Sequence, residues 1–150
     1  MAASTPVTKS RERIKAILDV VSGYSSARIK LGNVDLLAEN TLLSALATAG
    51  PYVTVGRANL EGGTISSPSI YGFEVPVHFW FGYADDAAND FVAIEDLLVT
   101  ALAALMTKSN WTGADYGMTP LSYELEEETE DAGKPRRLHY VARFQFGKGL

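Results

Sequence analysis

Residues 70–83, IYGFEVPVHFWFGY, carry the pattern that decides the fold. Large apolar side chains recur at every second position, and most of the residues between them are small or polar. A period of two indicates a β-strand with one face on a hydrophobic core. The sequence therefore predicts a strand whose core face carries Tyr71, Phe73, Val75, Val77, Phe79 and Phe81.

Two residues on the even face of this strand need an explanation. Pro76 has no N–H to donate to a ladder, which predicts that the strand lies at an edge of the sheet or is bulged there. Trp80 is a large aromatic on the face away from the core. Such a side chain needs a cover, supplied either by this chain or by a partner.

The end of the chain predicts a β-hairpin. The alternating segments 121–128 and 136–146 flank a turn at 131–134. A turn centred between its two middle residues brings apolar residues together on one face and charged residues together on the other. The expected pairs are Glu128 with Arg137, Glu126 with His139, Ser122 with Arg143, Leu125 with Tyr140 and Leu121 with Phe144.

Two helices are predicted from apolar residues at i, i+3, i+4 and i+7. The first runs from about Pro6 to Gly23 and keeps a basic face outside, and the second runs from Asp85 to about Thr107. Their buried stripes are Ile14, Ile17, Leu18 and Val21 in the first, and Phe91, Ile94, Leu98, Ala101, Leu102 and Leu105 in the second. The basic face consists of Lys9, Arg11, Arg13 and Lys15.

The segment between the first helix and the aromatic strand is less regular. Residues 27–31 are compatible with a short strand, residues 41–49 with a helix capped by Asn40, and residues 52–55 with a strand. Residues 56–69 are rich in Gly, Ser and Asn, which is typical of a flexible hairpin loop.

These elements predict an α+β fold in a single domain over residues 6–150, after a flexible N-terminus at residues 1–5. We expect a mainly antiparallel sheet of about four strands. The long helix should pack on one face of the sheet, together with the N-terminal amphipathic helix.

Composition narrows the functional classes. The chain has 150 residues, no cysteine and a formal net charge of −5. Residues 76–150 hold twelve of the 18 acidic residues but six of the 13 basic ones. An acidic surface disfavours tight duplex binding. The N-terminus does not resemble a signal peptide, and no apolar run is long enough to span a bilayer.

No pattern for catalysis or metal binding appears. His78 and His139 fall on different strands outside any zinc motif, and no serine lies in a G-x-S-x-G elbow. The carboxylates of residues 124–131 alternate along a strand, which favours a solvated face over a calcium site or an acid/base pair. We therefore expect no enzyme activity and no cofactor.

The order of the elements resembles that of tail terminator (tail completion) proteins of tailed bacteriophages, the class that contains the minor tail protein U of lambdoid phages. The likeness covers residues 6–147. It rests on the basic helix, the strand and polar loop after Pro51, the aromatic strand, the helix from Asp85, the Trp111-x-Gly113 turn and the acidic hairpin. Residues 24–49 and Pro76 depart from it.

This resemblance implies a homo-oligomeric ring, expected to be a hexamer, in the tail or neck of a virion assembled in the host cytoplasm. The ring would cap the tail tube and meet the tube protein and neck or head-completion proteins. DNA would pass through it without specific binding, and no membrane would be involved. The residues expected at the subunit interface are Trp80, Trp111, Arg11 and Lys15. Those expected to line an acidic bore are Glu124, Glu126 and Glu128.

Three alternatives stay open at this stage. A neck or head–tail adaptor (connector) protein of similar fold would use similar surfaces. A small-molecule-binding or enzyme domain would have a pocket between the long helix and the sheet, with a polar group inside it. A regulatory adaptor would act as a monomer or dimer.

Overall fold

The computed structural model describes residues 6–31, 51–59, 65–67, 70–82, 88–111, 118–128 and 137–148. Several predicted features lie outside these residues. They are the flexible N-terminus at residues 1–5, the helix at 41–49, the first residues of the second helix and the hairpin turn at 131–134.

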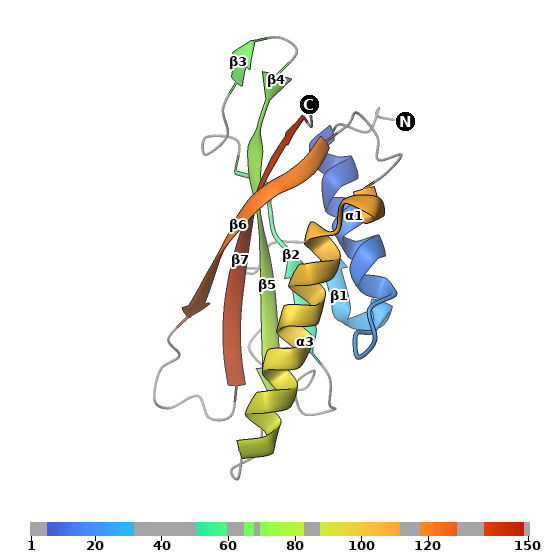
Figure 1. The fold of residues 1–150 in the computed structure, drawn as a ribbon, viewed down its shortest axis with the longest axis vertical. Coiled ribbons are helices and arrows are strands. Elements are labelled where there is room, and N and C mark those ends of the chain that lie inside the picture. The colour runs from blue at the N-terminus through green and yellow to red at the C-terminus, as the bar shows by residue number, and fades with distance from the viewer. Residues whose placement is uncertain are drawn as a thin grey trace.

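The α+β class is confirmed, but the sheet is larger than expected and mixed. Five strands lie in the order β1-β2-β5-β7-β6, with β1 parallel to β2 and every other neighbouring pair antiparallel. They are β1 (Ile29–Leu31), β2 (Tyr52–Val55), β5 (Phe73–Gly82), β7 (Arg137–Lys148) and β6 (Met118–Glu128). A separate two-stranded ribbon, β3 (Ile65–Ser67) with β4 (Ile70–Tyr71), extends beyond one end of this sheet (Figure 1).

The two α-helices of the described segments lie on the same side of the sheet and contact each other (Figure 1). They are α1 (Pro6–Asp19) and α3 (Ala88–Met106), and short 3₁₀ turns follow at η1 (Ser26–Arg28) and η3 (Lys108–Trp111). Gly23, expected to end the first helix, follows α1 by four residues at a φ of 93°. A left-handed φ suits glycine because it has no Cβ.

The core lies between the helices and the odd-numbered face of β5, as the alternation predicted. Each strand adjacent to β5 adds apolar residues to the same layer, and the helices close it with most of the predicted stripes. Val21 lies after α1 and is partly buried. The buried residues include Phe73, Val75, Val77, Phe79 and Phe81 of β5, Val53 and Val55 of β2, Phe144 and Phe146 of β7, and Ile14, Leu18, Leu98, Leu102 and Leu105 of the helices.

Pro76 does not mark an edge, so that half of the prediction is wrong. The expected irregularity is present on one side: the pairing shifts by one residue across Pro76, between Val55 opposite Val77 and Asn59 opposite Glu74. β5 is the central strand, and its register with β7 runs without a break. On the other side β2 ends at Val55, and Gly56 N–H donates to the Pro76 carbonyl at 2.8 Å. The missing donor of Pro76 therefore lies at an irregularity of the pairing, before it resumes with Asn59 opposite Glu74.

The hairpin of β6 and β7 forms, but its predicted register is wrong by two residues. Glu128 lies opposite His139, Glu126 opposite Val141 and Leu125 opposite Ala142. Between Pro120 and Ser122 the ladder shifts by one residue, so that Pro120 lies opposite Phe146. Over residues 122–128 a slip of two keeps every side chain on its predicted face, so the pattern of apolar and charged residues does not distinguish the two registers. Leu121, predicted opposite Phe144, lies instead on the outer face.

Candidate functional site

Trp111 belongs to the core. It is 4% exposed, and its indole lies edge-on to Phe146 at 5.3 Å between ring centroids. Its Nε1–H donates to the Leu105 carbonyl at 2.7 Å, in the last turn of α3. Carbonyls in the last turn of a helix have no partner within the helix, so this bond caps α3. Trp111, expected at a subunit interface, therefore has almost no exposed surface in the subunit.

Trp80 is also covered by the chain itself, since only 3% of its surface is exposed. Its ring stacks on His139 at 4.5 Å and on His78 at 5.4 Å, and it meets Tyr52 edge-on at 6.4 Å. Of the two covers expected for this side chain, the structure shows the one supplied by its own chain. A subunit contact at Trp80 or Trp111 stays a prediction. Neither indole is exposed on the surface of the subunit.

The basic face of α1 is occupied mainly by contacts within the chain. Arg11 Nη2 donates to the Val55 carbonyl at 3.0 Å, and burial lowers the pKa of its guanidinium. Arg13 Nε donates to the Asn110 carbonyl at 2.9 Å. Each guanidinium therefore ties α1 to another element, to the end of β2 and to η3 respectively.

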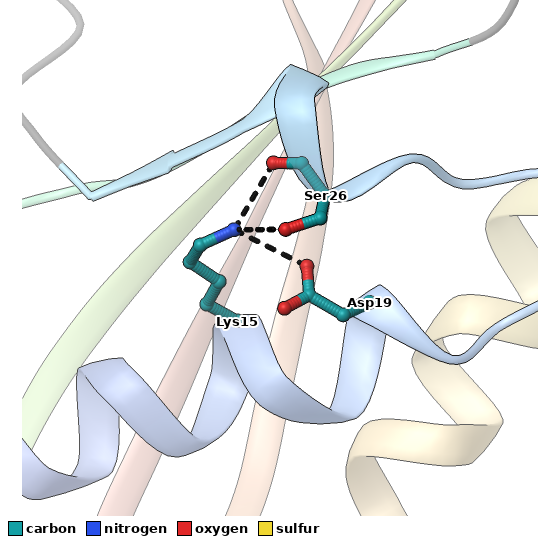
Figure 2. Close-up of polar contacts among 3 residues, drawn as sticks. All are labelled: Lys15, Asp19 and Ser26. Atoms are coloured by element: carbon teal, nitrogen blue, oxygen red, sulfur yellow. Dashed lines mark hydrogen bonds and ion pairs between the residues drawn. The ribbon is translucent and has the colours of Figure 1, made fainter.

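Lys15 serves the same purpose at the other end of α1 (Figure 2). Its Nζ lies 3.2 Å from Asp19 Oδ1 and donates to both the carbonyl and the hydroxyl of Ser26 at 3.0 Å. This three-way contact holds the turn after α1 against η1. Arg11 and Lys15 were expected at a contact with another subunit. In the structure both side chains form hydrogen bonds within their own chain.

The face of the sheet away from the helices carries a histidine pair. His78 Nδ1 and His139 Nε2 lie 2.8 Å apart, which is hydrogen-bond distance between β5 and β7. One ring nitrogen must accept, so at least one of the two imidazoles is neutral in this arrangement. Thr54 lies opposite His78 on β2, and its hydroxyl is buried without a hydrogen bond.

Sequence reasoning placed these histidines on separate strands and did not bring them together. The sequence does show that both histidines lie on the face of an aromatic-rich strand that points away from the core. Only the pairing of β5 with β7, which puts His78 opposite Val141 and Trp80 opposite His139, makes them neighbours. Across the described part of the chain, no group of three or more His, Cys, Asp or Glu side chains is arranged to hold a metal ion.

The acidic row expected to line a bore lies on the same outer face as the histidines, on β6. Glu124 lies opposite Arg143, whose Nη1 forms an ion pair with Glu126 Oε2 at 2.5 Å. Glu128 follows at the end of the strand, opposite His139. One cation on β7 thus serves a row of carboxylates, and Glu124 and Glu126 remain exposed.

The other face of β6 is exposed and apolar, which sequence reasoning missed. Tyr123 lies against Phe144 at 5.3 Å between ring centroids, on the same side of the sheet as the helices. Yet β6 bends away from α1 and α3 toward its C-terminal end (Figure 1), so the helices leave this row open. The exposed residues of this face are Tyr123 at 38% and Leu125 at 44%. Leu121, at 58%, lies at the register shift and covers Gly147 on the outer face.

The opposite end of the sheet also presents exposed side chains. In β1, Ile29 is buried, whereas Lys30 and Leu31 are exposed. Among the described strands, β1 and β6 are the two that have a neighbour on one side only. The exposed apolar and charged side chains described here therefore lie on the two end strands of the sheet, β1 and β6.

None of the helices in the described segments is long and apolar enough to cross a membrane. No known protein-family model matches the chain, and a search of curated proteins finds no similar sequence.

Proposed function

We propose that this protein is a structural virion subunit, a phage tail terminator that assembles into a ring. The ring caps the tail tube and provides the surface that joins the tube to the head or neck. The observation that carries the proposal is the exposed apolar row of β6. The exposed side chains of Tyr123 and Leu125 on one face of this strand form a surface typical of a protein–protein contact.

The reverse face of β6 supports the same proposal. A row of carboxylates repels the phosphates of DNA, so a ring that turns this face toward its bore lets DNA slide through without binding. The exposed carboxylates of Glu124 and Glu126, continued by Glu128 in sequence, fit this role. We assign these residues to the bore as part of the proposal.

The packing between α3 and the sheet favours a scaffold over a small-molecule-binding domain. Apolar side chains from both layers fill that interface, including Leu98, Leu102, Phe79 and Phe144, which are at most 5% exposed. A ligand pocket there would need room and a polar group to orient its ligand. A neck or head–tail adaptor would use the same outer surfaces, and its position in the particle is what separates it from a terminator.

The test is the oligomeric state of the protein and of a variant on β6. Native mass spectrometry at micromolar concentration, with and without tube protein, should show a closed ring for the wild type. Leu125→Lys should abolish it, because burying the exposed part of a leucine contributes about 1 kcal/mol per contact and burying a lysine costs more.

Val99→Lys is the matched control. Val99 is 63% exposed on α3, so its replacement adds the same charge to a different surface and should leave the ring intact. A protein that stays monomeric under every condition would overturn the proposal. A ring that tolerates Leu125→Lys would remove β6 from the subunit interface.

A further inference from the structure

Among the described strands, the two at the ends of the sheet, β1 and β6, carry side chains that complement each other on both faces. On the helix side of the sheet, β6 presents Tyr123 and Leu125, and β1 presents Leu31, which lies opposite the core residue Val55. All three are exposed and apolar. Unpaired strand edges with exposed apolar residues readily accept a further strand.

The rows on the outer face carry opposite charges. β6 presents Glu124 and Glu126 there, and β1 presents Lys30, which lies opposite Thr54 on the same face. Suppose that β6 of one copy lies beside β1 of another copy, with the helices of both on the same side. The apolar side chains of the two strands then meet, and Lys30 lies beside Glu124 and Glu126. Both faces are then satisfied by one arrangement.

We infer that β6 of one subunit pairs with β1 of the next subunit, so that the sheet continues from copy to copy around the ring. This inference rests on the proposed function and adds the surface through which it operates. The two patches are different, as a head-to-tail contact requires, and repeating the contact closes a ring when the rotation allows it.

The strand directions fit this contact. β6 runs parallel to β5 and therefore antiparallel to β2 and β1, as the chain of pairings shows. A rotation axis along the strands leaves their directions unchanged, so β6 and the neighbouring β1 meet as an antiparallel pair. Antiparallel strands form inter-strand hydrogen bonds perpendicular to the strands.

Pairing β6 with β6 of a second copy is disfavoured by the same residues. An antiparallel self-contact would bring the acidic residues at 124 and 126–128 of the two copies together. Like charges directly opposite each other destabilise a sheet. The acidic row therefore selects a partner strand that carries a cation, which β1 has in Lys30.

Cross-linking tests the pairing directly, because the chain has no cysteine of its own. Leu31→Cys and Leu125→Cys subunits are mixed and treated with a short bis-maleimide. A covalent dimer should form in the mixture and in neither variant alone. The doubly substituted chain should give a ladder of covalent oligomers. Val99→Cys replaces Leu125→Cys as the control and should give no dimer with Leu31→Cys.

A charge reversal provides the second readout. Lys30→Glu should weaken ring assembly by about tenfold or more, whereas Lys108→Glu, at an exposed lysine of η3, should leave it unchanged. Cross-linking of Leu125→Cys with itself would overturn the inference. So would a ring seen by native mass spectrometry without any mixed cross-link, and in that case the proposed function stands. A protein that is monomeric throughout overturns both.

Discussion

Replacing Trp111 with alanine should destabilise the fold of the subunit by about 3–5 kcal/mol, the usual cost of removing a buried tryptophan. The indole is 4% exposed, packs edge-on against Phe146 and caps the Leu105 carbonyl. Trp111→Phe keeps most of the packing but leaves that carbonyl without its donor, which should cost about 1–3 kcal/mol. Val99→Ala, at an exposed site on α3, should change stability by less than about 0.5 kcal/mol.

The assay is urea denaturation followed by circular dichroism at low protein concentration, where assembly does not contribute. With a slope of about 1–3 kcal/mol per molar urea, the Trp111→Ala midpoint should fall by about 2 M. The reasoning would be refuted if the Trp111→Ala midpoint stayed within about 0.3 M of wild type while ring assembly was lost. That result would place the indole at a subunit contact instead of in the core.

Two further predictions concern α1 and the turn that follows it. Gly23→Ala should destabilise the protein by about 1–3 kcal/mol, because φ at this position is 93° and an added Cβ would lie 2.4 Å from Leu97 Cδ2; an unchanged urea midpoint would contradict this. Tyr24 donates to the Leu97 carbonyl at 2.8 Å, and burial raises the pKa of its phenol. The folded state therefore keeps a proton that the unfolded chain loses above about pH 10, so stability should fall as pH rises beyond that point. Tyr24→Phe should cost about 1 kcal/mol at pH 7 and make the alkaline decline shallower, as denaturation midpoints from pH 8 to 11 would show. A decline as steep as that of the wild type would assign the effect to other groups, Tyr140 among them, since its pKa is also raised by burial.

The candidate surfaces depended on long-range packing much more than on local pattern. The helical spacing predicted the basic row of α1 correctly as a row, but Arg11, Arg13 and Lys15 donate to Val55, Asn110 and Ser26. No local pattern reveals such partners, because they come from segments up to 97 residues away. The same holds for the indoles of Trp80 and Trp111, whose covers are contributed by other elements.

What the sequence alone determined was which side chains share a face. Alternation along residues 73–81 and the helical spacing in α1 and α3 predicted the core residues correctly, because burial selects on the period of each element. The tertiary structure decided the register of the hairpin, the central place of β5 and the parallel pairing of β1. It also decided that residues 121–127 of β6 are exposed on both faces. These features depend on how strands are ordered and how far the helix layer reaches, and a period of two is the same for a strand at the centre of a sheet and for one at its end.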